Sequence, residues 1–408
     1  MYAPEERQFS LDHATRRIER EMRQLRLGAT VDVQGQGPCI ARTLLHDAGG
    51  SLLTVGWGKG EREAARTGSL YEAMEHLLSA RHLLTGAEVH PVEAVLAGLA
   101  GGGPGDMPLT LLADQIEETI ACRRYTSLCG REAFDYPLVL SAPDYLHATL
   151  PAETFDHAGL RRYASNSGTA IGACPAEALL HALNECIERD ALSLFLLTHF
   201  FHECDAPLYR VDPQCMPAHL TDLYDRACAA VDAPIALLDI TADGPVSTCF
   251  AVALHSYPYP RPYGAGASLN PAHAARRALT ELVQAEHGAA AADEAAQQAA
   301  SAMFDDLAAW PRLRAALAMD IETLLRRRRI IATGLRERPG GELCGQIRTI
   351  AAALDDQGLH PGYALLRQSF SGSSLVNVVV PGMERFFLVT AGNVVLPGSR
   401  GQALRPMQ

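Results

Sequence analysis

The sequence predicts a mixed α+β fold in which helices and strands alternate along the whole chain. Three observations support this class. Segments with apolar residues at helical spacing are separated by short runs rich in Val, Ile, Leu and Thr. Gly, Pro and Asn mark most boundaries between these segments. No internal repeat of about 20–50 residues is evident, which argues against a solenoid or a propeller.

The first part of the chain predicts a helix, three strands and a longer helix. Leu11, Ile18 and Leu25 share one face of the first helix, and Gly28 ends it. Runs rich in β-forming residues predict the strands, at 30–33, 39–45 and 52–55. Helical spacing returns over 61–84 and predicts the longer helix.

The rest of the chain continues the alternation. A glycine-rich joint at 101–105 leads us to expect two domains, 1–100 and 101–408. Helical spacing predicts helices at 111–122, 175–200, 285–302 and 345–357. Strands are predicted at 136–140, 235–240, 246–254, 363–367 and 375–380. Pro271 begins a further helix, with Asn270 placed as its cap.

The bulk composition argues against nucleic acids and membranes as partners. A net charge of -12 disfavours general nucleic-acid binding. The longest apolar run, around 191–201, is too short to span a bilayer, and the first residues lack the pattern of a signal peptide. The ten cysteines form no C-x-x-C pair of the kind that binds zinc. We therefore expect a cytoplasmic protein with reduced thiols.

Lys59 is the single lysine among 35 Lys and Arg residues. A compact ammonium binds differently from a planar guanidinium, so this lysine is a candidate functional residue. It lies in the run Gly58-Lys59-Gly60, after the predicted strand 52–55. Glycines at such a place let the backbone approach an anion. The alternative is a lysine retained by chance in a surface turn.

Two predicted helices each carry a pair of glutamates three residues apart, Glu72 with Glu75 and Glu185 with Glu188. Each pair lies opposite the apolar face of its helix. Beside the first pair lie small residues that suggest a groove, namely Ala65, Gly68 and Ser69. A single pair of this kind is also typical of a solvated face. Four carboxylates in one site, however, repel each other unless cations lie between them, and oxygen ligands of this type suit Mg²⁺ bound beside substrate phosphates.

A third predicted helix places Arg277, Glu281 and Gln284 on one face. Two interpretations of Arg277 and Glu281 remain open: an ion pair within the helix, or a guanidinium that Glu281 holds toward a phosphate. Common nucleotide motifs are missing. The run after Lys59 lacks the Ser or Thr of a Walker A loop, and Gly264-Ala265-Gly266 is not a convincing dinucleotide fingerprint.

In these motifs the chain resembles the YcaO family. The matching segments are Gly58-Lys59-Gly60, Glu72-x-x-Glu75, the turn 165–172 with the following Glu177, the segment 184–191 (Asn-Glu-Cys-Ile-Glu-Arg-Asp-Ala), Arg277-x-x-x-Glu281-x-x-Gln284 and the segment 380–384 (Val-Pro-Gly-Met-Glu). They cover most of the chain from about residue 50 to 290 and part of the tail. The acidic helix that follows the small-residue turn is the most specific of them.

The resemblance implies a fold that binds ATP and Mg²⁺ between acidic helices. The implied metal ligands are Glu72, Glu75, Glu185 and Glu188. The implied nucleotide-binding residues are Lys59, Ser69, Glu177, Asn184, Arg189, Arg277, Glu281 and Gln284, and the implied catalytic ones among them are Lys59, Arg189 and Arg277. The general base is not evident, and proximity to the motifs suggests His181, Asp190 and Glu384.

Family members phosphorylate the oxygen of a peptide amide, and a nucleophile then adds to the carbon. A neighbouring Cys, Ser or Thr side chain gives a thiazoline or oxazoline, sulfide gives a thioamide, and an amine gives an amidine. We therefore expect a cyclodehydratase that modifies a ribosomally made precursor peptide. The implied partners are a leader-binding protein, either E1-like or TfuA-like, a flavin dehydrogenase as a further candidate, and a second copy of the chain in a homodimer.

Three departures from the family pattern keep other functions open. Gly68 stands where serine is usual, and Ala173 stands where asparagine is common. The C-terminal residues 404–408 lack the Pro-x-Pro-x-Pro ending of many azoline-forming members, which keeps thioamide formation open. Two further classes remain: a different Mg-ATP enzyme, such as an amide ligase or a kinase, and a non-catalytic scaffold that positions a peptide.

Overall fold

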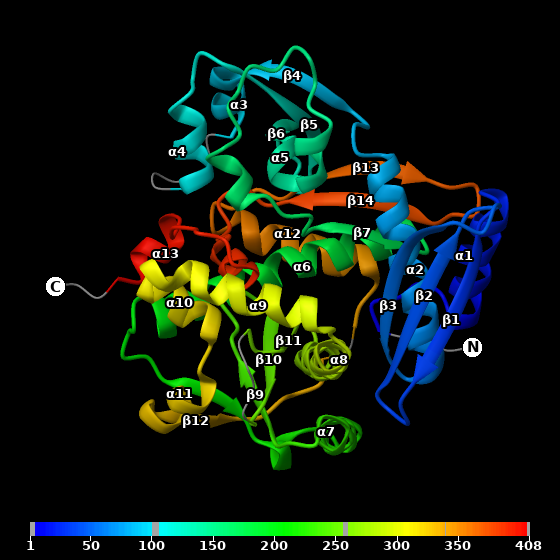
Figure 1. The fold of residues 1–408 in the computed structure, drawn as a ribbon, viewed down its shortest axis with the longest axis vertical. Helices are drawn as coiled ribbons and strands as arrows, with labels where there is room; N and C mark the ends of the chain where they lie inside the picture. Colours follow the sequence, from blue (N-terminus) through cyan, green and yellow to red (C-terminus); the bar gives the residue numbers. More distant parts are fainter. Residues whose placement is uncertain (1–4, 100–105, 256–259, 339, 406–408) are drawn as a thin grey trace.

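The computed structural model describes residues 5–99, 106–255, 260–338 and 340–405. Three β-sheets with helices packed around them make a mixed α/β fold, which confirms the predicted fold class (Figure 1). The expected division near residue 100 stays a prediction, and the glycine-rich joint 101–105 lies outside the described residues. Strands on either side of this joint, β4 and β5, pair with each other.

The chain begins with an antiparallel three-stranded sheet in the order β1-β2-β3 (blue in Figure 1). Its elements are α1 (Leu11–Gln24), β1 (Gly28–Gln34), β2 (Cys39–His46), β3 (Leu52–Gly60) and α2 (Arg62–Arg81). The side chain of Ser10 accepts the N–H of His13 and caps α1. The predicted apolar face of α1 is buried at Ile18 and Met22.

A six-stranded sheet combines strands from the middle and the end of the chain. Its order is β4-β5-β13-β14-β7, with β6 paired to β5. The strands are β4 (Ala87–Pro91), β5 (Thr119–Ser127), β6 (Phe134–Pro137), β7 (Thr169–Gly172), β13 (Gly362–Gln368) and β14 (Ser374–Val379). The short helices α3 (Val92–Gly98), α4 (Met107–Ala113) and α5 (Leu138–Ser141) lie at its β4–β6 end (Figure 1).

A five-stranded sheet in the order β11-β10-β9-β8-β12 lies on the other side of the molecule. Its strands are β8 (Leu208–Val211), β9 (Ile235–Asp239), β10 (Ser247–Ala253), β11 (Gly264–Ser268) and β12 (Ile330–Thr333), of which β12 pairs parallel with β8. Between β8 and β12 the chain also forms α7 (Ala218–Val231), α8 (Pro271–Ala290), α9 (Glu294–Asp306), α10 (Pro311–Ala318) and α11 (Ile321–Arg327), of which α7 and α8 pack on this sheet. As predicted, Asn270 caps α8 through its side chain, which accepts the N–H of Ala272.

Helix α6 (Pro175–Leu196) lies at the centre of the fold and continues as a π-helical turn, Leu197–Phe201 (Figure 1). It contacts β7 and β14 of one sheet, β11 of the other, and helix α12 (Leu343–Asp355). The last helix, α13 (Ser399–Ala403), also contacts α6. Because α6 is packed on several sides, its polar residues Asn184 and Glu188 are buried together with its apolar ones.

The structure corrects four of the predicted elements. The predicted helix 111–122 is wrong: α4 ends at Ala113, and β5 begins at Thr119 because its backbone completes ladders with β4 and β6. The predicted strand 136–140 ends at Pro137 and gives way to α5. The predicted helix 285–302 is divided between α8 and α9. Strand β3 runs on to Gly60 through the residues predicted to form a turn.

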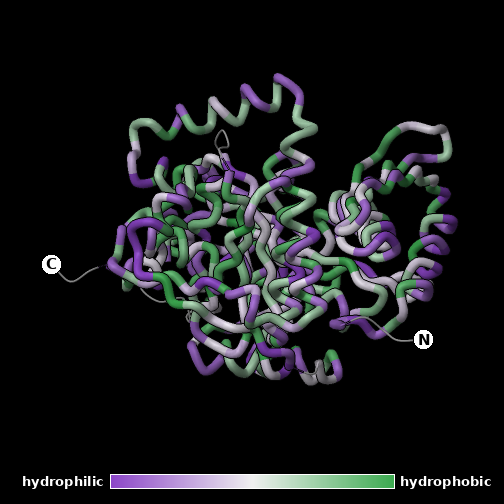
Figure 2. The backbone as a smooth tube through the Cα atoms, turned by 90° about the horizontal axis from the view of Figure 1, so that it is seen from below, coloured by the Kyte–Doolittle hydropathy of each residue, from purple (hydrophilic) through white to green (hydrophobic). Residues whose placement is uncertain are grey.

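Hydrophilic and hydrophobic residues alternate at short intervals along the chain (purple and green in Figure 2). Among the helices of the described residues, none combines the length and the apolar character needed to cross a membrane.

Candidate active site

Strand β3 and helices α2, α6 and α8 bring most of the predicted charged residues into one region. Helix α2 contacts β7 and β14, which α6 also contacts, and α8 packs on β11 and β3. The charged side chains that interact there are Lys59, Glu72, Glu75, Glu185, Glu188, Arg189, Arg277 and Glu281. Residues that lie far apart in the sequence therefore meet, as two Glu-x-x-Glu helices in one site require.

Two glycines before Lys59, Gly56 and Gly58, serve the packing of a strand on a helix. A Cβ atom at Gly58 would lie 1.9 Å from the carbonyl oxygen of Ala65, and one at Gly56 would lie 2.2 Å from the backbone nitrogen of Ala73. Both positions therefore need glycine so that β3 can approach α2. The run therefore belongs to a strand and not to a turn, and Gly58 is explained by packing, whereas a Cβ atom at Gly60 would make only an ordinary contact at 3.8 Å. Because side chains alternate along a strand, Lys59 points to the opposite face from Gly58.

Lys59 pairs with Glu281 and so links β3 to α8. The Nζ atom lies 2.5 Å from Oε2 of Glu281, and the two side chains are 30% and 24% exposed. Burial alone would raise the pKa of Glu281, but the ammonium of Lys59 and the guanidinium of Arg189 outweigh it and lower the pKa. Glu281 thus stays ionised and holds the ammonium of Lys59 at the edge of the cluster of glutamates.

Glu188 is the most deeply buried of the predicted metal ligands, with a side chain only 3% exposed. Its Oε2 atom lies 3.6 Å from Nη2 of Arg277 and has no hydrogen-bond partner among the described residues. Burial raises the pKa of Glu188 to about 7, and repulsion from Glu281 adds to the rise. A buried acceptor without a donor is a position that a cation would stabilise.

The other three glutamates are also destabilised as anions. Burial raises the pKa of Glu72 and of Glu185, and it raises that of Glu75 well above its usual range. Backbone amides offset part of this effect: Glu75 accepts the N–H of Ile171 at 2.8 Å, and Glu185 accepts the N–H of Gly168 at 3.2 Å. A divalent cation among these side chains would relieve both their burial and their mutual repulsion.

The donor set fits Mg²⁺, although the carboxylates are not gathered around one point. Among the residues that the structure describes, no group of three or more His, Cys, Asp or Glu is arranged to hold one ion. Glu75 and Glu185 are turned toward backbone amides instead. The chemistry of the site fits, because hard carboxylate oxygens are the usual protein ligands of Mg²⁺ and bound phosphates complete its shell.

The two arginines reach the site from different sides. Nη1 of Arg277 lies 3.3 Å from Nδ1 of His181, and its Nη2 faces Glu188. The ion pair within the helix, one of the two interpretations of Arg277 and Glu281, is thus replaced by contacts of each residue with another element. Arg189 lies 3.9 Å from Glu185 and stacks 5.4 Å over the ring of Phe387. Its Nε atom is buried and has no hydrogen-bond partner in the described parts of the chain.

The remaining residues predicted to bind the nucleotide lie in different surroundings. Ser69 is fully buried, and its hydroxyl contacts the hydroxyl of Thr43 in β2, so the structure does not bring it to the carboxylates. Gln284 is half-buried and lies one turn beyond Glu281 on α8. Glu177 and Asn184 are both buried on α6 and are held by residues before α1.

The three candidate general bases separate into two places. His181 lies beside Arg277, and its burial, reinforced by that guanidinium, lowers its pKa well below the usual range. Asp190 accepts the N–H of Glu384, whose own carboxylate accepts the N–H groups of Gly398 and Gly401 at 3.0 and 2.6 Å. Asp190 and Glu384 therefore hold α13, and His181 is the candidate at the site.

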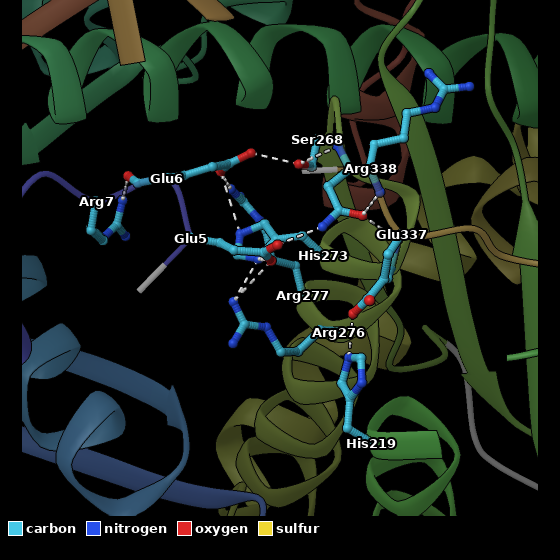
Figure 3. A network of polar contacts seen from close by, with 12 residues as sticks. Glu5, Glu6, Arg7, His219, Ser268, His273, Arg276, Arg277, Glu337 and Arg338 are labelled. Carbon is cyan, nitrogen blue, oxygen red and sulfur yellow. Dashed lines mark hydrogen bonds and ion pairs between the residues drawn. The ribbon is translucent and has the colours of Figure 1, made fainter. Parts of the chain in front are cut away.

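Two residues at the site escaped the sequence analysis. Glu6 and His273 contact each other and lie next to Arg277 and Asn184 (Figure 3). His273 lies one helical turn before Arg277 on α8, so its spacing could have placed it on the same face of the helix. Glu6 precedes the first predicted helix, and no pattern in the sequence indicates that it folds back to α6 and α8.

Comparisons with known proteins agree with this arrangement. The sequence model of a family described as YcaO cyclodehydratase, ATP- and Mg²⁺-binding, matches residues 57–384. A curated relative, an uncharacterized protein of Methanothermobacter thermautotrophicus, is 34% identical over 123 residues, which are 29% of this chain and 30% of the relative. The chain thus spans about a third of the length of the curated relative that it matches.

Three solved structures share the fold. The structure of YcaO from Methanopyrus kandleri bound with AMPPCP and Mg²⁺ is 17% identical, with a TM-score of 0.62 over 96% of both chains. A heterocyclase in complex with substrate and cofactor is 16% identical, with a TM-score of 0.63 over 94% of this chain and 54% of that one. The E. coli microcin synthetase McbBCD complex with pro-MccB17 bound is 14% identical, with a TM-score of 0.55 over 88% of both chains.

Proposed function

This chain belongs to the YcaO family, and we propose that it is an ATP-dependent enzyme that activates backbone amides of a ribosomally made precursor peptide and closes thiazoline or oxazoline rings. The cofactors of the family are ATP and Mg²⁺. One observation carries the proposal for this chain: four glutamates from α2 and α6, of which Glu188 is buried and the other three are half-buried, interact with each other and with Lys59, Arg189 and Arg277. Such a group suits a magnesium-bound polyphosphate.

The proposed chemistry needs a better leaving group than an amide oxygen. Bound ATP with Mg²⁺ would supply the phosphoryl group that makes this oxygen leave. The chain's own residues have the remaining tasks. Lys59 and Arg277 approach the carboxylates from β3 and α8 and would bind phosphate oxygens, where charge develops. His181, which stays neutral, would accept a proton beside Arg277.

We expect the chain alone to modify a peptide at least about tenfold more slowly than the chain together with a leader-binding partner. Binding energy from a leader would then be provided by another protein, which orients the amide. A solved relative of the same fold is a complex of several proteins with a peptide bound, the E. coli microcin synthetase. The measurement is the mass of the peptide and the release of phosphate, with and without the candidate E1-like or TfuA-like partner.

The masses in this experiment also identify the product. Loss of one water per modified site supports azoline formation, whereas replacement of oxygen by sulfur, dependent on sulfide, would assign thioamidation instead. Rapid and complete modification by the chain alone would contradict the need for a partner. Phosphate release without any change in the peptide would point to another class of Mg-ATP enzyme. The expected homodimer stays a prediction that light scattering can test on the same preparation.

Replacing Lys59 by arginine should lower peptide-dependent ATP hydrolysis on the order of a hundredfold while the protein stays folded. Lys59 lies on a strand between two glycines and reaches Glu281 through a flexible stem. The wider, planar guanidinium cannot occupy the same point between Glu281 and a phosphate. The measurement is steady-state phosphate release together with the melting temperature.

The matched control is Arg62→Lys, the reciprocal exchange at the exposed start of α2. It should leave the rate unchanged, because Arg62 lies outside the group of interacting charges. Full activity of Lys59→Arg would show that the chain needs only a positive charge at this position, and that its single lysine is an accident of composition.

A further inference from the structure

The segment before α1 crosses the candidate active site. Residues 5–9, here called the N-terminal strap, run between helices α6 and α8 and are followed by Ser10, the cap of α1. In Figure 3 the side chains of Glu5 and Glu6 point toward Ser268 and toward the residues of α8 that Figure 3 labels. The strap therefore lies against α6 and α8, two of the helices that carry the candidate site.

Glu6 is the central contact of the strap. Its side chain is 6% exposed, and its Oε1 accepts hydrogen bonds from Oγ of Ser268 at 2.6 Å and from Nδ2 of Asn184 at 3.3 Å. Its Oε2 lies 3.4 Å from Nε2 of His273 and 4.0 Å from Nη1 of Arg277. A buried carboxylate is thus surrounded by donors, as a bound anion would be.

The neighbours of Glu6 fasten the strap at both ends. Glu5 accepts a hydrogen bond from Asn270 at 2.5 Å and lies 3.0 Å from Nδ1 of His273. On the other side, Oε1 of Glu177 accepts the backbone N–H of Gln8 at 2.7 Å and that of Phe9 at 3.3 Å. These contacts are polar, the ring of Phe9 in addition packs under the guanidinium of Arg17 in α1, and a cavity of about 240 Å³ adjoins Glu5 and Glu6. The strap is held by donors and acceptors that another ligand could take over.

Glu6 adopts a backbone conformation that its contacts must maintain. Its φ of 57° lies in the left-handed region, which is unfavourable for a residue other than glycine. Strain of this kind persists only where the surroundings enforce it, and here the enforcing partners include His273 and Arg277. Loss of these partners to another anion would release the strain as well.

Three residues held by the strap are ones that the family resemblance assigns to the nucleotide. They are Glu177, Asn184 and Arg277, from two different helices. We propose that the strap is a built-in competitor of the nucleotide: Glu6 occupies the anion-binding position beside Arg277, and the strap must leave before MgATP binds. This inference rests on the proposed function, since it assumes that the site binds MgATP.

Competition of this kind has a measurable consequence. If only the open form binds the nucleotide, the apparent dissociation constant equals the intrinsic one divided by the open fraction. Replacement of Glu6 by glutamine removes the charge that attracts Arg277 and His273 and keeps the size of the side chain. The open fraction then rises, and we expect MgAMPPCP to bind about tenfold more tightly, the change that a single charge-assisted hydrogen bond can produce.

The test compares MgAMPPCP binding to the full chain and to Glu6→Gln by calorimetry. Asp12→Asn is the matched control, because it removes one negative charge from the exposed part of α1 just beyond the strap. Tighter binding by Glu6→Gln, with no change in Asp12→Asn, supports the strap as a competitor. Equal affinity of all three proteins for MgAMPPCP overturns the inference that the strap competes with the nucleotide, and leaves the proposed ATP-binding site intact. No binding by any of them overturns both.

A second measurement uses the unmodified protein and does not depend on how well a variant folds. The backbone amides of Gln8 and Phe9 are bonded to Glu177, so hydrogen exchange in a peptide that contains them reports on release of the strap. Addition of MgAMPPCP should speed their exchange at least severalfold and slow that of α6 and α8. Slower or unchanged exchange at Gln8 and Phe9 would show that the strap stays in place with the nucleotide bound, and would overturn the inference.

Discussion

Replacing Glu188 by glutamine should lower peptide-dependent ATP hydrolysis by about a hundredfold or more while the fold is preserved. Glu188 is buried, and its Oε2 lacks a hydrogen-bond partner among the described residues. If that oxygen binds Mg²⁺, the amide of glutamine cannot replace it as an anionic ligand. Glutamine has nearly the shape of the protonated acid, so the packing of α6 should not change. Phosphate release at saturating ATP, measured with precursor peptide and partner, checks the result.

The control for this experiment is Glu63→Gln, which makes the same exchange on the exposed first turn of α2. It should keep the full rate. The melting temperature of Glu188→Gln should equal or exceed that of the unchanged protein, because the substitution removes a buried charge repelled by Glu281. A folded Glu188→Gln protein with normal hydrolysis would exclude Glu188 as a metal ligand.

Replacing Gly58 by alanine should destabilise the protein by about 3 kcal/mol or more. The added Cβ atom would lie 1.9 Å from the carbonyl oxygen of Ala65 and 2.5 Å from the backbone nitrogen of Ser69. Both are main-chain atoms of α2, so no side-chain rotation can relieve the clash and β3 must separate from the helix. Denaturant unfolding, with the midpoint and slope fitted together, measures the change.

Gly68 on α2 offers a matched control, since a Cβ atom there would lie 3.7 Å from the Cα of Gly58, an ordinary contact. Gly68→Ala should stabilise the protein by about 0.5–1 kcal/mol, because alanine favours a helix more than glycine does. Serine, the usual family residue at this position, would also fit the same space. If Gly58→Ala proved as stable as the unchanged protein, the close approach of β3 to α2 would be wrong.

Local signals explain why some elements were predictable from sequence. Helix α8 begins where Asn270 and Pro271 placed its start, since capping is chemistry between neighbouring residues. Helix α6 follows its helical spacing over more than five turns, long enough for the period to be unambiguous. The two Glu-x-x-Glu pairs lie in one region because α2 and α6 both pack on β7 and β14, although the shared cation that we predicted from their repulsion stays a prediction.

Other features depend on partners that lie far away in the chain. Strand β5 was predicted as helix up to Cys122, yet its backbone is paired with β4, β6 and β13, one of which comes from the last quarter of the sequence. The glycines beside Lys59 signalled close approach, but the sequence could not show that the approaching group is α2. The strap had no signal at all, because two glutamates before a helix are typical of a solvated end.

If Glu188 binds Mg²⁺ as we propose, its burial in the central helix serves activity at a cost in stability. A carboxylate held in this position weakens the fold, and the apolar or amide residues that could take its place would strengthen it. A duplicated copy of the gene, once freed from catalysis, would therefore gain stability by exchanging this residue while α6 kept its packing. Descendants of this protein that have lost the activity should therefore carry an apolar or amide residue in place of Glu188, while the residues packed around it stay unchanged.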